Sequence, residues 1–411
     1  MNLAKAKRKI ISMFRLGKHS LNLDLIKRCA ICPQDSKHAD ETRLDAAIDW
    51  LKRAQDISNC GGVPAGYSLT KGWLPLYPET TGYIIQTFAV CAKILERSDL
   101  LERAFKMGDW EISIQFPNGA IPGGWGINSY PIVFNTGQVV LGWNTLFSIT
   151  GERRFIDAAK RACDWLIDMI DEDGCWWKHT YHNVPHAYNS RVAWALLQTN
   201  ELCGEDKYKN AAKKNIEWVL ENIIDHGYFK YMSFENEKPF THNIAYTISG
   251  LVESIPYLPE LEARILDAII QPCDILFDKY LEKSRDRKEP KMLPARFDPH
   301  WNSYDRFSCL TGNVQFAQIF YALSKMTGKE KYRQAADALV EGVKTTQSIN
   351  NQNPTIRGAI AGSFPIFGKY LRFTFPNWAT KFFIDALLEK MFDKGISLKD
   401  FKSCQSSKAK I

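Results

Sequence analysis

Long apolar runs are missing from this chain of 411 residues. No segment reaches the roughly 18 consecutive apolar residues that a membrane-spanning helix needs. The first apolar stretch, around Ile10 and Ile11, is interrupted at Ser12 and Arg15, well short of the apolar region of a secretory signal. We therefore expect no transmembrane helix and no secretory leader, and we expect a cytoplasmic location.

The chain also lacks the common motifs of nucleotide and metal enzymes. It contains no GxxxxGK[ST] phosphate-binding loop, no Rossmann glycine pattern and no HExxH zinc motif. The aspartate-rich motif expected of a terpenoid cyclase is missing as well. We therefore predict no cofactor and no motif-defined metal site, although carboxylates on loops would suit a divalent ion such as Ca²⁺.

The globular part of the chain has no excess of charge of either sign. The formal net charge is +7, and residues 1–28 contain eight lysines and arginines against a single acid, Asp24. The remaining residues are neutral overall, which argues against nucleic acid as a partner. Because segment 1–28 also contains Met13, Phe14 and Leu16, it suits either peripheral contact with an anionic inner membrane or a solvated lead-in.

A repeat is the strongest structural signal in the sequence. An acidic residue followed by tryptophan recurs at Asp49-Trp50, Asp109-Trp110, Asp164-Trp165 and Glu217-Trp218, with weaker copies near 262–280 and 332–347. Apolar residues around these pairs recur every three or four positions, and charged residues fill the other positions. This pattern indicates helices with one solvated face, and we expect the tryptophans on the buried side.

A second set of segments alternates with the first and is apolar on nearly every side, which is typical of buried helices. Thr, Ser and Asn are frequent at their starts, where we expect them to act as N-caps. Six solvated helices alternating with six buried ones predict an all-α protein, an (α/α)6 toroid with an outer and an inner ring. The predicted domains are a basic tail over residues 1–38, the toroid over 39–395 and a C-terminal tail over 396–411.

The links between the predicted helices differ in length according to their direction. Links from inner to outer helices are short turns, such as 150–153 and 327–330, whereas links from outer to inner helices are long: 56–78, 116–134, 171–188, 225–241, 281–310 and 348–376. Long loops in a compact domain are usually functional. Because all six precede the N-termini of inner helices, the helix dipoles on this face favour an anionic ligand.

Six motifs mark the starts of the inner helices: Tyr77-Pro78-Glu79-Thr80-Thr81-Gly82-Tyr83, Asn135-Thr136-Gly137-Gln138, His186-Ala187-Tyr188-Asn189-Ser190-Arg191, Thr241-His242-Asn243-Ile244-Ala245-Tyr246, Cys309-Leu310-Thr311-Gly312-Asn313 and Pro376-Asn377-Trp378. Over about residues 40–391 the chain resembles an (α/α)6-toroid family encoded among bacterial surface-polysaccharide genes. It is more distantly similar to uronate-polysaccharide lyases, glucuronyl C5-epimerases and six-hairpin glycoside hydrolases. The resemblance implies the toroid and a carbohydrate context, but not one reaction.

The residues at the inner-helix starts fit the chemistry of an acidic sugar. A lyase or C5-epimerase must neutralise the sugar carboxylate, remove the C5 proton and stabilise an enolate-like state. Arginine binds a carboxylate bidentately, and histidine and tyrosine serve as base and acid. The predicted catalytic residues are Glu79, His186, Tyr188, Arg191, His242 and Tyr246. The predicted substrate-binding residues are Trp73, Tyr77, Trp125, Asn135, Gln138, Asn189, Trp301 and Asn313.

Other functions stay open. A glycoside hydrolase would use Glu79 with a second carboxylate from among Asp173, Glu235, Asp298 and Asp305. Outside the enzymes, a glycan-binding or polysaccharide-assembly scaffold would bind without turnover. Single roles are open too, because His242 also suits a structural position and Arg191 an internal pair with Glu79. We favour an enzyme whose substrate is an anionic, uronate-containing bacterial polysaccharide or its lipid-linked precursor.

Overall fold

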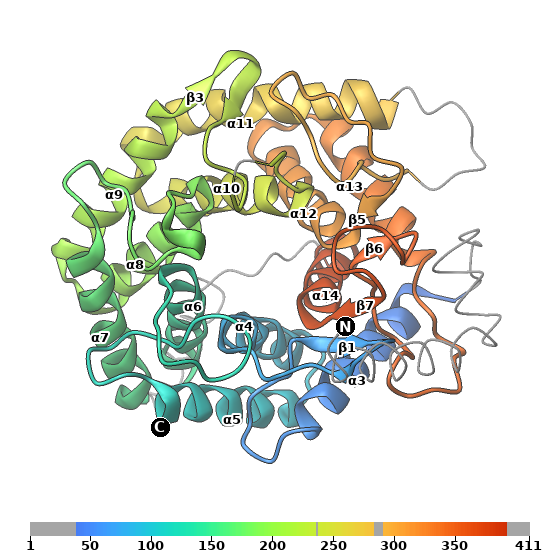
Figure 1. Ribbon diagram of the computed structural model, residues 1–411, viewed down its shortest axis with the longest axis horizontal. Helices are drawn as coiled ribbons and strands as arrows, with labels where there is room; N and C mark the ends of the chain where they lie inside the picture. The colour runs from blue at the N-terminus through green and yellow to red at the C-terminus, as the bar shows by residue number, and fades with distance from the viewer. Residues whose placement is uncertain (1–37, 236, 283–290, 393–411) are drawn as a thin grey trace, which may run out of the picture.

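The computed structural model describes residues 38–235, 237–282 and 291–392. Within these residues, twelve α-helices form two concentric rings, and the predicted (α/α)6 toroid is confirmed (Figure 1). The outer ring contains α3 (Asp40–Asp56), α5 (Ser98–Ile114), α7 (Arg153–Met169), α9 (Asp206–Glu221), α11 (Glu262–Leu276) and α13 (Glu330–Lys344). The inner ring contains α4 (Pro78–Ile94), α6 (Val133–Thr150), α8 (Ser190–Cys203), α10 (Thr241–Ser254), α12 (Leu310–Thr327) and α14 (Asn377–Phe392).

The predicted basic segment 1–28 and the predicted tail 396–411 lie outside the described residues. The bounds of the predicted domains therefore stay predictions. In the ranges that the structure describes, no helix combines the length and the apolar character needed to cross a membrane.

The outer helices are amphipathic, as the repeat predicts. Their tryptophans Trp50, Trp110, Trp165 and Trp218 are all buried. The Trp50 indole also donates a hydrogen bond to the backbone oxygen of Thr355, at 2.9 Å. The repeated tryptophan is therefore part of the packing between the rings and the loops.

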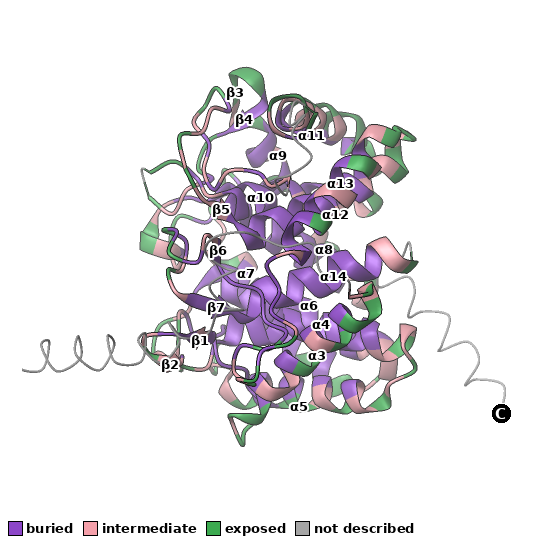
Figure 2. Cartoon of the chain, turned by 90° about the vertical axis from the view of Figure 1, so that its right-hand side faces the viewer, coloured by how far each residue is buried: buried purple, intermediate pink, exposed green. Residues whose placement is uncertain are grey.

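The inner helices are buried along almost their whole length (Figure 2). Glycines at their starts allow neighbouring helices to approach closely. A Cβ atom on Gly82 would lie 2.6 Å from the Cα of Val139, so a side chain there would separate α4 from α6. Short turns then return the chain to the outer ring, and Gly151, Gly204 and Gly328 end α6, α8 and α12 in the left-handed conformation.

The long loops gather at one end of the toroid, where they contain all the described β-strands (Figure 2). Antiparallel strands β1 (Gly66–Ser68), β2 (Gly72–Trp73) and β7 (Thr374–Pro376) form a small sheet in the order β2-β1-β7. Strand β3 (Ile223–Ile224) pairs with β4 (Tyr228–Phe229), and β5 (Ser308–Cys309) pairs with β6 (Ser363–Phe364). Short helical turns complete the loops: η2 (Tyr181–Asn183), η3 (Ala187–Asn189), η4 (Asp225–Gly227), η5 (Ile255–Tyr257), η6 (Pro259–Leu261) and the π-helical η7 (Phe277–Glu282).

The prediction that Thr, Ser and Asn cap the inner helices is wrong for α4, α6, α8 and α10, where no side chain at the N-cap position makes a capping hydrogen bond. The N-cap positions of α4, α6 and α10 are occupied by Tyr77, Ile132 and Phe240, none of which provides a capping side chain. The threonine lies one turn further on, where the Thr81 hydroxyl accepts a hydrogen bond from the Val63 amide at 3.0 Å. It therefore anchors the preceding long loop.

Asparagines at the inner-helix starts act in the same way. The side-chain amide of Asn377 donates to the backbone oxygen of Pro64 at 2.8 Å, and that of Asn135 donates to Pro122 at 3.2 Å. Each bond ties a loop to the first turn of a buried helix. Much of the repeated Thr and Asn signal therefore comes from loop attachment, which every repeat needs.

Candidate active site

A cavity of about 390 Å³, here called the central cavity, opens among the long loops. Its volume lies in the range typical of small-ligand sites. It is lined by residues near the N-termini of α4, α6, α10 and α14 and by residues of five long loops, and most of its side chains are aromatic. The lining residues are Tyr77, Glu79, Trp125, Phe134, Tyr181, His182, Tyr188, Phe234, Phe240, His242, Asn243, Tyr246, Lys369, Tyr370, Leu371 and Trp378.

Glu79 provides the carboxyl group in this lining. Pro78 begins α4 and Glu79 follows it, so the side chain lies at the positive end of the helix. The Tyr77 hydroxyl donates a hydrogen bond to Glu79 Oε2 and lies 2.7 Å from the Tyr181 hydroxyl. Burial raises the pKa of Glu79 to about 7, although the Tyr77 hydrogen bond and the charge of Arg191 act to lower it. Glu79 is therefore able to take up and release a proton near neutral pH.

His242 lines the cavity from the second position of α10. Its Nδ1 lies 3.1 Å from Gln315 Oε1, and its ring packs against Tyr246 with 4.4 Å between centroids. Burial lowers the pKa of His242 to about 3, and the nearby charge of Arg191 acts in the same direction. The imidazole is neutral at neutral pH, which suits hydrogen bonding better than proton abstraction. The pKa of Glu79 is better matched to the role of base.

Arg191 does not belong to the lining of the central cavity. Its guanidinium donates to Gln138 Oε1 at 3.0 Å and to Ser249 Oγ at 3.2 Å, and it lies 5.1 Å from the Tyr246 ring centroid. Burial lowers the pKa of Arg191. The expected direct pairing with a sugar carboxylate therefore has no support in this arrangement. No ion pair between Arg191 and Glu79 is recorded in the described structure either, and the charge acts on Glu79 from a distance.

Tyr188 and His186 are stacked, with ring centroids 4.5 Å apart, but they face different surroundings. Tyr188 lines the cavity. The ring nitrogens of His186 lie outside the cavity lining, 3.1 Å from the Ser233 backbone oxygen and 2.9 Å from that of Tyr181. Burial lowers the pKa of His186 to about 4. His186 therefore supports Tyr188 from behind, and its predicted catalytic contact has no support in the geometry.

Tyr246 completes the set of predicted catalytic residues that reach the cavity. Its hydroxyl donates to the Tyr83 hydroxyl at 3.4 Å, and burial raises its pKa. Tyr246 therefore stays a neutral phenol at neutral pH. Of the six predicted catalytic residues, Glu79, Tyr188, His242 and Tyr246 line the cavity.

Among the predicted substrate-binding residues, Tyr77 and Trp125 line the cavity and the others do not. Asn313 is held between loop backbone groups, donating to Cys309 at 2.8 Å and accepting from Leu293 at 2.7 Å. Trp301 is fully buried and donates to His226 at 2.8 Å.

Three of the remaining four have structural contacts as well. Trp73 packs against Trp50, Gln138 accepts from Arg191, and Asn135 anchors its loop. Asn189 is buried in η3, and both atoms of its side-chain amide lack a hydrogen-bond partner.

Much of the aromatic lining was missed by sequence reasoning. The second residue of four inner helices lines the cavity, namely Glu79, Phe134, His242 and Trp378. The repeat in the sequence marks that position, so it could have predicted Phe134 and Trp378 as lining residues. Residues such as Tyr181, Phe234 and Lys369 lie within long loops that have no repeated pattern, so the sequence does not predict that they line the cavity.

The carboxylates considered as partners of Glu79 in a hydrolase lie outside the lining. Asp305 forms a two-point contact with Arg296, and Asp298 lies 3.6 Å from Lys238. Glu235 lies 3.1 Å from His182, whereas Asp173 accepts from the Trp177 indole. Over the described residues, no group of three or more potential metal ligands occurs either.

No protein-family model matches the chain. A curated relative, lanosterol synthase erg7A of Aspergillus fumigatus, is 25% identical over 206 residues, which is 45% of this chain. The match spans only 25% of that relative's length.

Solved structures of sugar enzymes share the fold over most of their length. An unsaturated glucuronyl hydrolase specific for heparin has a TM-score of 0.67 at 12% identity, covering 87% of this chain and 100% of the other. Cellobiose 2-epimerase from Bacillus thermoamylovorans has a TM-score of 0.66 at 13% identity, covering 86% and 98%. A D-mannose isomerase has a TM-score of 0.64 at 14% identity, covering 87% and 99%. At such identities the likeness establishes the (α/α)6 toroid alone.

Proposed function

We propose that this protein is a carbohydrate-active enzyme that moves a proton on an acidic sugar, by lyase or C5-epimerase chemistry. The observation that carries the proposal is Glu79, a buried carboxyl group with a pKa of about 7 beside an aromatic cavity. The glucuronyl hydrolase and the sugar epimerase of the same fold support a saccharide substrate. A uronate-containing bacterial surface polysaccharide, or its lipid-linked precursor, is the proposed source.

The proposed reaction begins with ionised Glu79 removing the proton at C5, next to the sugar carboxylate. The electron pair moves into an enediolate at that carboxylate. In a lyase it then expels the substituent at C4 and leaves a C4–C5 double bond, whereas in an epimerase a proton returns to the opposite face of C5. Tyr188 and Tyr246, as neutral phenols on the cavity wall, are suited to donate such a proton.

Hydrolysis with two carboxylates receives less support from the same geometry. Such a mechanism needs a second carboxyl group within about 5–9.5 Å of the first. Among the described residues, Glu79 is the carboxyl group in the cavity lining.

The test is incubation of the protein with defined uronic-acid oligosaccharides in deuterated water. A new unsaturated-uronate absorbance identifies a lyase, and deuterium incorporation without cleavage identifies an epimerase. Both signals should disappear in Glu79→Gln. New reducing ends without either signal would favour a hydrolase, and binding without turnover would favour the scaffold.

The aromatic lining also favours a second candidate, acid-initiated cyclisation of a linear isoprenoid. A protonated Glu79 would donate a proton to an alkene or epoxide, and aromatic faces stabilise the resulting cations. The local match to a lanosterol synthase agrees with this chemistry. Cyclic products from a polyprenoid substrate, without turnover of uronates, would support this candidate over the first.

Contact of segment 1–28 with anionic membranes and a cytoplasmic location are also proposals. Co-sedimentation of the full chain and of a chain lacking residues 1–28 with anionic vesicles tests the membrane contact. Equal sedimentation of both would contradict it.

A further inference from the structure

Lys369 is an exposed cation in the lining of the central cavity. It lies in the segment between β6 and β7, which backbone hydrogen bonds hold in place. The Gly368 amide donates to the Pro365 oxygen at 2.8 Å, and the Phe373 amide donates to the Ile366 oxygen at 2.9 Å. The backbone beneath Lys369 is therefore fixed, while its side chain stays accessible.

Two other basic side chains on the long loops already have acidic partners. Arg296 contacts Asp305 at 2.6 Å, and Lys238 lies 3.6 Å from Asp298. His182, which also lines the cavity, lies 3.1 Å from Glu235. For Lys369, by contrast, the described structure records no ion pair. Lys369 is thus a cation of the lining that is available to a ligand.

Two buried polar atoms of the lining lack hydrogen-bond partners. These are the hydroxyl of Tyr188 and the amide oxygen of Asn243, in residues that are 2% and 1% exposed. A buried polar group without a partner is costly, so such groups normally find one. A ligand with hydroxyl groups would satisfy both, because a sugar hydroxyl donates to the Asn243 oxygen and accepts from the Tyr188 hydroxyl.

We propose that Lys369, Asn243 and Tyr188 form the recognition set for one acidic sugar residue. Lys369 binds the carboxylate at the mouth of the cavity, and Asn243 and Tyr188 bind ring hydroxyls inside it. The inner-helix N-termini around the cavity also favour an anion. This inference rests on the proposed function and deepens it, because it assigns the anion specificity to Lys369 in place of Arg191.

The test is calorimetric titration of the full chain with glucuronic acid, glucose and glucose 6-phosphate. Lys369→Met should weaken glucuronic acid binding by about tenfold or more, as expected for a hydrogen bond to a charged group. Glucose binding should stay within about twofold, and Lys369→Arg should retain most of the preference for the acid. The matched control is Lys178→Met, an exposed lysine on another long loop and outside the lining.

Tyr188→Phe and Asn243→Leu should weaken both glucose and glucuronic acid, because they remove hydroxyl contacts that the two sugars share. An unchanged preference for the acid in Lys369→Met would overturn the inference, as would a stronger Lys369-dependent binding of the phosphate than of the carboxylate.

Turnover assays separate this inference from the proposed function. A Lys369→Met enzyme that still converts uronates with unchanged acid preference removes the inference and leaves the function standing. Lys369-dependent carboxylate binding without any conversion by the parent protein supports the inference and removes the function.

Discussion

Buried polar side chains on the inner helices differ in their partners between the wall of the central cavity and two ion pairs away from it. Away from the cavity lining, Lys381 lies 2.6 Å from Asp385, which also accepts from Thr87 at 2.7 Å. The buried Glu389 lies 2.5 Å from Lys325, which is exposed. The acids of both pairs are therefore matched by lysines.

The wall of the central cavity is arranged in the opposite way. Burial raises the pKa of Glu79 to about 7 and lowers that of His242 to about 3, so neither group is firmly charged at neutral pH. Tyr188 and Asn243 each contribute a polar atom without a partner. The two ion pairs stabilise the ring, whereas Tyr188 and Asn243 line the cavity, so their unmatched atoms are available to a ligand. Lack of a partner is not confined to the cavity, since Gln198 and Asn200 of α8 each have a buried oxygen without one. The comparison therefore separates the two ion pairs from the cavity wall.

The largest expected effect is on catalysis, at the wall of the central cavity. Glu79→Gln should lower kcat/KM by about 10²- to 10⁴-fold, the usual contribution of a general acid or base. As a base, Glu79 must be ionised, so parental activity should rise with pH through about 7, the pKa of Glu79. Thermal stability should not fall. A variant that melts early but retains specific activity would place Glu79 in the scaffold.

In the buried Lys381–Asp385 pair, Asp385→Asn should destabilise the fold and leave the catalytic activity unchanged. It leaves the buried Lys381 charge without its acid, which typically costs about 3–5 kcal/mol in the free energy of unfolding. Denaturant titration measures this loss. Lys381→Met with Asp385→Leu replaces the pair with apolar groups and should recover most of the stability. If Asp385→Asn instead abolished activity in a protein of normal stability, the division between site and scaffold would fail.

The fold was predictable because the same physical demand recurs in every repeat. Each outer helix must cover an inner helix, so tryptophan and one apolar face recur, as at Trp50 and Trp165. The helices are long and periodic, and their alternation leaves few other arrangements. The mistaken N-caps show the limit of this argument, since Thr81 anchors a loop that was not placed by the sequence.

The candidate site was predictable only in part, because a binding site does not repeat. Glu79 and His242 were found from their place at helix starts, but Asn313 has the same kind of position and is satisfied by loop backbone. Sequence pattern does not distinguish a polar group with partners from one without. Lys369 was missed for a related reason, since its loop folds back over the ring and no local pattern encodes that contact.

A smaller effect is expected at a buried carboxyl group that has no partner and lies outside the cavity lining. Glu111 is fully buried on outer helix α5, outside the cavity lining, and neither carboxyl oxygen has a partner. Burial raises its pKa well above the usual value, so the contribution of Glu111 to stability is most favourable below about pH 4.5 and becomes less favourable as the pH rises from there. Glu111→Met should add about 1–3 kcal/mol to the unfolding free energy at pH 7. Lost activity with unchanged stability would instead make Glu111 functional.

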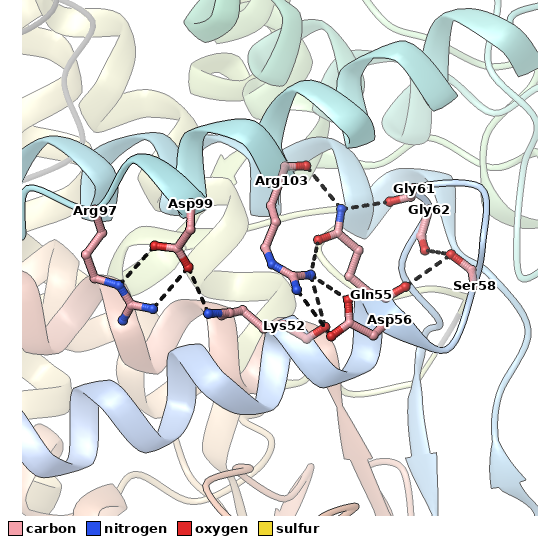
Figure 3. A network of polar contacts seen from close by, with 9 residues as sticks. All are labelled: Lys52, Gln55, Asp56, Ser58, Gly61, Gly62, Arg97, Asp99 and Arg103. Atoms are coloured by element: carbon pink, nitrogen blue, oxygen red, sulfur yellow. Dashed lines mark hydrogen bonds and ion pairs between the residues drawn. The ribbon is translucent and has the colours of Figure 1, made fainter.

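The smallest effect is expected where matched charges are exposed, between α3 and α5 (Figure 3). Asp99 accepts from Lys52 at 2.8 Å and from Arg97 at 3.2 Å, and these contacts lower its pKa to about 2. Its folded pKa is below the unfolded value, so this stabilisation is present above about pH 4 and is lost as the pH falls toward 2. Because solvent screens such pairs, Asp99→Asn should cost less than about 1 kcal/mol at pH 7 and still less near pH 2. Urea titrations of both proteins at the two pH values measure the difference. A loss as large as that of Asp385→Asn would mean that burial does not control the strength of matched pairs in this toroid.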